Sequence, residues 1–77
     1  MSRIVPIHWK KLECVFLRAG FEFIRQTGGH RHYFKKGMLR PVTIPVHGDS
    51  VAKFVIQNNL RTAQISRDDY FRFLADC

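Results

Sequence analysis

The sequence has no long hydrophobic run, and this absence limits where the chain is expected to reside. Its first 20 residues contain no apolar stretch of the length found in a secretory signal. No later segment approaches the ~20 apolar residues that a membrane-spanning helix needs. We therefore expect a cytoplasmic protein with no membrane partner.

Cysteine is also scarce. The two cysteines, Cys14 and Cys77, are too few for the disulfide framework that supports many small secreted domains. Cys14 falls within a helical pattern and Cys77 is the last residue, where chains are usually loose, so we expect both to be free thiols in a reducing compartment. The chain has no CxxC or HExxH spacing typical of zinc sites, and no metal or other cofactor is expected.

Acidic side chains are few compared with basic ones. Six Asp and Glu stand against 13 Lys and Arg, which gives a formal net charge of +7. A small basic domain is attracted to polyanions, of which nucleic acid is the commonest. Charge of this size also serves solubility alone, so it favours a nucleic-acid partner without establishing one.

The 77 residues are expected to form one domain, residues 1–77, and their hydrophobic pattern changes period along the chain. Apolar residues in 8–19 recur at the 3, 4 spacing of an amphipathic helix that ends at Gly20. Strand-like runs follow at 21–27, 30–36 and 40–47, and Gly28-Gly29 is a hairpin signal because both glycines accept positive φ. Pro45 cannot donate to a ladder, so the third strand should lie at an edge or leave the sheet there.

Two further helices complete the pattern. Asp49 and Ser50 offer capping oxygens for a helix running to about Leu60, with a stripe of Val51, Phe54, Val55 and Asn58. Ser66 opens a short last helix through a capping box with Asp in place of Glu, and Tyr70, Phe71, Phe73 and Leu74 supply its apolar contacts. The order α-β-β-β-α-α predicts a two-layer α+β fold, with a three-stranded antiparallel sheet covered by helices on one face. The other face is left for solvent or a ligand.

Histidines concentrate on the predicted open face. Alternation along 30–36 puts His30, His32 and Phe34 on one side and Arg31, Tyr33 and Lys35 on the other. Because Tyr33 suits the buried side, the two histidines should face outward, with His47 at the end of the neighbouring strand. Histidine can give or take a proton near neutral pH, which makes this face a candidate catalytic surface. Ordinary surface positions for His32 and His47, a structural place for His8 and, more weakly, a metal site are the alternatives.

The stretch GGHRHY, followed by VTIPVHG, resembles the signature of HicA-type toxins, the small messenger-RNA interferases of bacterial and archaeal toxin–antitoxin pairs. That signature has Gly-Ser-His after a hairpin, an aromatic residue three positions past the histidine, and then Val-x-Val/Ile-Pro-x-His. The matching residues are Gly28, His30, Tyr33, Val42, Ile44, Pro45 and His47. The similarity continues to Ala63-Gln64-Ile65-Ser66, where the family usually has glycine in the place of Gln64.

The resemblance implies a fold like that of double-stranded-RNA-binding domains and a metal-independent endoribonuclease with His30 as its catalytic residue. It also implies RNA as substrate and a HicB-type antitoxin as protein partner. The expected RNA-binding residues are Arg31, His32, Lys35, Lys36 and Arg40, and the expected structural residues are Gly28, Gly29, Tyr33, Pro45 and His47.

The chain departs from the family pattern at two places. Gly29 replaces the serine before the histidine, and the second helix has Gln57 where a cation is common. Both departures bear on rate and RNA affinity more than on fold. The alternative function is a non-catalytic RNA-binding module, which is less favoured because Lys53 is the only lysine of the second helix. A neighbouring gene for an acidic protein would favour the toxin.

Overall fold

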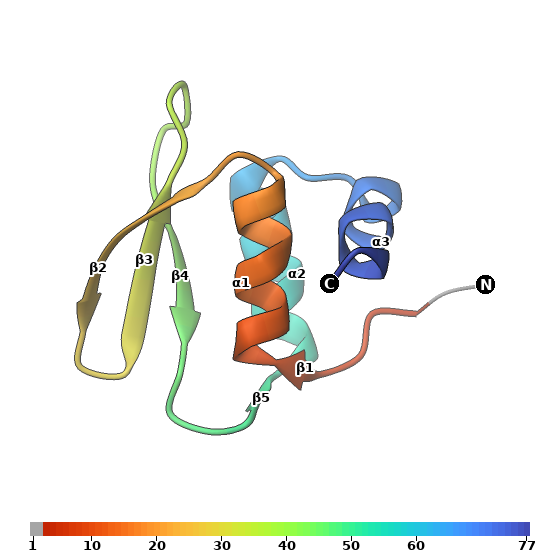
Figure 1. Cartoon of the computed structure of the whole chain (residues 1–77), viewed down its shortest axis with the longest axis horizontal. Coiled ribbons are helices and arrows are strands. Elements are labelled where there is room, and N and C mark those ends of the chain that lie inside the picture. The colour runs from red at the N-terminus through yellow and green to blue at the C-terminus, as the bar shows by residue number, and fades with distance from the viewer. Residues whose placement is uncertain (1–2) are drawn as a thin grey trace.

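The computed structural model describes residues 3–77 and places a small sheet against a layer of helices (Figure 1). Strands β2, β3 and β4 form an antiparallel sheet in that order, which confirms the α+β prediction. α1 and α2 lie next to this sheet, and α3 packs on α1 from the far side. The elements are β1 (Ile7–His8), α1 (Trp9–Arg18), β2 (Glu22–Thr27), β3 (His30–Phe34), β4 (Val42–Pro45), β5 (Ser50–Val51), α2 (Lys53–Ala63) and α3 (Arg67–Ala75).

α1 forms where the apolar spacing predicts it. His8 is its N-cap, and its Nδ1 accepts a hydrogen bond from the Lys10 amide at 3.1 Å. Leu12, Val15 and Phe16 are buried on the side that faces the core. The residues of α1 are therefore arranged as the amphipathic pattern requires.

The sheet supplies the other half of the core. Tyr33 of β3 and Val42 and Ile44 of β4 are buried, as strand alternation predicts. β4 is an edge strand, in agreement with the expectation for a strand that contains Pro45.

The prediction for the start of α2 is wrong. Ser50 and Val51 are held in an extended conformation by pairing with His8 and Ile7, so the helix begins only at Lys53 and has no side-chain cap. Its buried residues are Ile56, Asn59, Leu60 and Ala63, whereas Phe54, expected on the apolar stripe, is 66% exposed. The β1–β5 pairing joins segments far apart in the sequence, which explains why local capping signals mislead here.

The C-terminal helix corrects the expectation of free thiols. Ser66 caps α3 by accepting a hydrogen bond from the Asp69 amide at 3.1 Å, and Tyr70 is buried, both as predicted. The packing of α3 on α1 brings the C-terminus back to Cys14, and Cys14 and Cys77 form a disulfide with a Cα–Cα distance of 6.1 Å. The two cysteines are therefore joined across 63 residues of sequence.

Candidate active site

The strand register defines which residues share the open face of the sheet. Residues directly opposite each other project from the same side. Tyr33 is opposite Val42 and Arg31 is opposite Ile44, and because Tyr33, Val42 and Ile44 are buried, these pairs mark the side of the helices. The open face consists of Glu22, Arg25 and Thr27 from β2, His30, His32 and Phe34 from β3, and Thr43 and Pro45 from β4.

The rings of His30 and His47 meet at one end of this face. Their centroids are 5.4 Å apart with an interplanar angle of 86°, an edge-to-face arrangement. Both residues are exposed. The amide of Val46 donates a hydrogen bond of 2.8 Å to the carbonyl of Gly29, so strand-like pairing continues past Pro45 and carries His47 to the hairpin. The sequence places His47 at the end of a neighbouring strand, but only the structure shows that it contacts His30.

The two glycines of the hairpin have different roles. Gly28 has the left-handed φ of 57° that the turn requires, whereas Gly29 has no positive φ, so the prediction for the pair holds only for Gly28. A Cβ atom on Gly29 would lie 1.9 Å from Cε1 of His47. Glycine at position 29 therefore makes room for the His47 imidazole.

Within residues 3–77, the ring of His32 has a polar contact with another side chain, unlike the rings of His30 and His47. Its Nδ1 lies 3.0 Å from Oγ1 of Thr43 on β4, within hydrogen-bond distance, and the residue is half-buried. This cross-strand contact fixes the ring on the open face and occupies one of its nitrogens.

Arg31, expected among the RNA-binding residues, lies on the side of the helices. Its Nε is 3.1 Å from Oε2 of Glu13 on α1 and 3.0 Å from the Tyr33 hydroxyl, and its guanidinium carbon is 4.0 Å from the centroid of the Phe23 ring. The Tyr33 hydroxyl also donates to Glu13. These contacts connect β3 to α1 behind the open face.

Burial and hydrogen bonding shift two pKa values in this cluster. Burial, together with the hydrogen bond to Glu13, raises the pKa of Tyr33 to about 12. The pKa of Arg31 is also raised, chiefly by its hydrogen bond to Tyr33. Both shifts favour the protonated side chains in the folded protein, so this cluster serves stability and is not poised for proton transfer.

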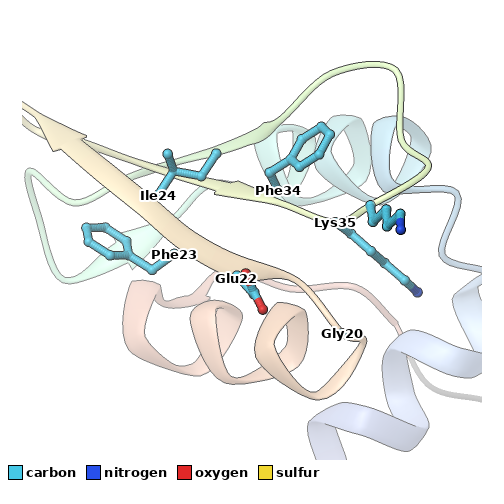
Figure 2. Close-up of a pocket in the computed structure, with 7 residues that line it drawn as sticks. Gly20, Glu22, Phe23, Ile24, Phe34 and Lys35 are labelled. Atoms are coloured by element: carbon cyan, nitrogen blue, oxygen red, sulfur yellow. The ribbon is translucent and has the colours of Figure 1, made fainter.

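A hollow of about 870 Å³ lies where β2 begins and β3 ends. The register of β2 shifts between Phe23 and Arg25, and Figure 2 shows the extra residue Ile24 on the same side of the hairpin as Phe34. Ile24 is 47% exposed and Phe34 37% exposed, so the hollow has an apolar floor beside cationic side chains. Its lining residues are Gly20, Glu22, Phe23, Ile24, Phe34, Lys35 and Lys36.

The other cations predicted to bind RNA, Lys35, Lys36 and Arg40, lie away from His30. Lys35 donates a hydrogen bond of 2.9 Å from Nζ to the Ala19 carbonyl at the end of α1. Arg40 lies in the connection between β3 and β4, in a smaller hollow that Arg61 of α2 also lines. The structure therefore brings His30, His32 and His47 together and puts Lys35, Lys36 and Arg40 toward the opposite end of the hairpin.

Residues 3–77 contain neither a metal-binding cluster nor a membrane-spanning helix. No three His, Cys, Asp or Glu side chains in this range are arranged to hold a metal ion. None of the helices in the same range is long and apolar enough to cross a membrane.

Comparison with known proteins agrees with the resemblance noted in the sequence. The model of the HicA toxin family of bacterial toxin–antitoxin systems matches residues 9–65, a range that contains α1, the three-stranded sheet, α2 and both members of the His30–His47 contact. No curated protein matches the chain. Since the family match covers most of the chain, the protein belongs to the family of HicA toxins of bacterial toxin–antitoxin pairs.

Proposed function

We propose that this protein is an endoribonuclease toxin that cleaves RNA with His30 and is neutralised by a HicB-type antitoxin. The observation that carries the proposal is the position of His30 at the head of β3, exposed on the one face of the sheet that no helix covers. Within residues 3–77 its ring contacts His47 but makes no side-chain hydrogen bond, so both nitrogens can reach a substrate.

The chemistry suited to such a residue is attack of the ribose 2′ oxygen on the adjacent phosphorus, with cleavage of the bond from phosphorus to the 5′ oxygen. Neutral imidazole can take the 2′-hydroxyl proton, and imidazolium can give a proton to the departing 5′ oxygen. The products are a 2′,3′-cyclic phosphate and a 5′-hydroxyl. DNA lacks the 2′-hydroxyl, which accounts for RNA as the substrate.

The rest of the open face suits a single-stranded RNA. His30 and Phe34 are four residues apart on β3, a distance of about 13 Å at the usual rise of a strand. The exposed ring of Phe34 offers a platform on which a base can stack, and Lys35 and Lys36 beside it supply positive charge for phosphates. We therefore propose that RNA extends from His30 past His32 to this hollow.

The other predicted RNA-binding residues contribute in different ways. Arg31 supports β3 from the side of α1 and adds to the positive potential of the domain. Arg40 adds charge at the far turn of the hairpin. Because the chain carries a net charge of +7, an acidic antitoxin would be attracted to this surface and would exclude RNA by covering it.

The test is incubation of the purified protein with single-stranded RNA in the presence of EDTA. Cleavage by the parent, and its loss in His30→Ala, is the expected result. His8→Asn is the matched control, because His8 lies outside the site and asparagine can keep the capping role at the start of α1. Circular dichroism establishes that the three proteins are folded.

Two results would contradict the proposal. Equal cleavage by the parent and by His30→Ala would show that another residue or a contaminant cuts the RNA. RNA binding by both proteins without cleavage would favour the non-catalytic RNA-binding module.

A further inference from the structure

The four histidines divide into two kinds by their hydrogen bonds. His8 caps α1, and His32 lies within hydrogen-bond distance of Thr43, so each has a polar contact within the fold. His30 and His47 have no such side-chain hydrogen bond within residues 3–77, and they lie edge to face on the open sheet face. Both rings are exposed, so their nitrogens are open to a ligand.

The position of His47 depends on two features of the backbone. The Val46 amide donates to the Gly29 carbonyl at 2.8 Å, which holds the chain beside the hairpin immediately before His47. The ring then lies over the Cα of Gly29, where a Cβ would be 1.9 Å from Cε1, 2.1 Å from Nε2 and 2.3 Å from Nδ1. Glycine leaves that space open in this structure, and a larger residue would turn the exposed His47 ring away from its present place beside His30.

The proposed cleavage needs two proton transfers at different oxygens. One proton leaves the 2′-hydroxyl, and another must reach the 5′ oxygen, which departs on the opposite side of the phosphorus. One imidazole cannot contact both oxygens in the same step. The His30 and His47 rings are in edge-to-face contact, with centroids 5.4 Å apart, at one end of the open face. Both are exposed, so when the rings turn apart each can reach one of the two oxygens of a phosphate bound there.

We infer that His47 is the second proton-transfer residue of this site and acts opposite His30 in the same step, an assignment that rests on the ribonuclease function proposed above. One neutral imidazole of the pair takes the 2′-hydroxyl proton while the 2′ oxygen bonds to phosphorus. The bond from phosphorus to the 5′ oxygen breaks, its electron pair stays on that oxygen, and the other imidazole, entering as imidazolium, donates its proton there. The pair ends with its protonation reversed, and exchange with water restores it.

The test uses two substrates that differ at one atom. The first is an RNA oligonucleotide that the parent cleaves, and the second has sulfur in place of the 5′ oxygen at the mapped cleavage position. A thiolate leaves without being protonated, so the second substrate does not need the general acid. Cleavage rates are measured for the parent, His30→Gln and His47→Gln, with His8→Asn as the control.

Both site variants should cleave ordinary RNA about 100-fold or more slowly than the parent, the usual contribution of one general acid or base. One of the two, and only one, should recover to within about tenfold of the parent on the sulfur substrate, because loss of the acid no longer matters there. That variant identifies the acid, and the other identifies the base. A variant that had merely lost structure would be impaired on both substrates.

Gly29→Ala tests the same inference without changing either histidine. The added methyl group would occupy the space of the His47 ring, so cleavage of ordinary RNA should fall toward the level of His47→Gln. Gly48→Ala is the matched control, since its methyl group meets no atom within 4 Å although it lies next to His47. Thermal unfolding of both variants shows that the fold is retained.

Several outcomes would overturn the inference. They are cleavage of ordinary RNA by His47→Gln at about the parental rate, impairment of both histidine variants on both substrates, and equal cleavage by Gly29→Ala and Gly48→Ala. An inert parent would instead remove the ribonuclease function on which the inference rests, and a fully active His30→Gln would remove the assignment of cleavage to His30. The two failures are therefore distinguishable.

Discussion

The polar side chains on the two faces of β3 differ in their contacts. On the side of α1, Arg31 and Tyr33 bond to each other and to Glu13, and these contacts connect the sheet to a helix. On the open side, His30 is exposed and its ring lies edge to face with the ring of His47. Strand alternation thus lets five consecutive residues serve the core on one side and present reactive groups on the other. In a domain with so thin a core, the structural and the reactive side chains are therefore kept apart by the face of the strand from which they project.

The largest effect is predicted for substitutions of two neighbouring aromatic residues on β3, one on each face. Tyr33→Ala should lower the free energy of unfolding by about 5 kcal/mol, because it removes a fully buried ring and leaves Glu13 and Arg31 without their hydroxyl partner. A loss of that size is comparable with the whole stability of a small domain. Phe34→Ala should lower it by about 1 kcal/mol, since that ring is 37% exposed.

Urea unfolding followed by circular dichroism measures both changes in stability. RNA binding is measured as well, because there Phe34→Ala should have a clear effect. Phe34→Ala should bind single-stranded RNA more weakly by about 1–3 kcal/mol, the usual contribution of one stacked base. Comparable stability losses in the two variants would show that the faces are not separated as described. Unchanged RNA affinity in Phe34→Ala would remove the stacking platform from the proposed RNA path.

The next largest effect on stability is expected from loss of the disulfide, which joins α1 to the C-terminus away from the open face. Closing a loop across 63 residues stabilises a folded chain by at most about 4 kcal/mol in the chain-entropy model. Cys14→Ser should lower the free energy of unfolding by up to that amount, and the cleavage rate of the folded fraction should not change. A reducing agent should destabilise the parent to the level of Cys14→Ser and should have no further effect on the variant. Two titratable thiols in the native, unreduced parent would contradict the disulfide.

The fold could be predicted wherever neighbouring residues determine it. The spacing of Leu12, Val15 and Phe16 predicts α1, and the glycines and alternating apolar residues predict the three-stranded sheet. The start of α2 and the state of the cysteines could not be predicted, because both depend on segments far apart in the sequence. β1 holds β5 in an extended conformation, and the packing of α3 on α1 brings Cys77 to Cys14.

The candidate site shows the same limit at the level of single side chains. Alternation correctly puts His30 and His32 on the open face, but it cannot give the ring orientation that brings His47 to His30. It also puts Arg31 on the side of Tyr33, and the missing information was that Glu13 on α1 lies within reach of both. For Gly29, turn chemistry suggested a backbone reason for glycine, whereas the structure shows that a side chain from another strand end needs the space.

The smallest predicted effect is a pH dependence of the free energy of unfolding, caused by Tyr33 on the buried side of β3. The pKa of Tyr33 is raised to about 12, so the unfolded chain loses this proton from about pH 10 while the folded protein still holds it. The unfolded state then binds fewer protons than the folded state, and the free energy of unfolding falls as the pH rises from about 10 to about 12, by about 2 kcal/mol in total. Urea unfolding at pH 9, 10 and 11 should show this decline in the parent and a shallower one in Tyr33→Phe, which keeps the ring but cannot titrate. The two proteins share every other side chain, so only the difference between their pH profiles reports on Tyr33. Parallel pH profiles would mean that burial and the hydrogen bond to Glu13 do not raise the pKa of Tyr33 in the folded protein, which would contradict its place on the buried side of β3.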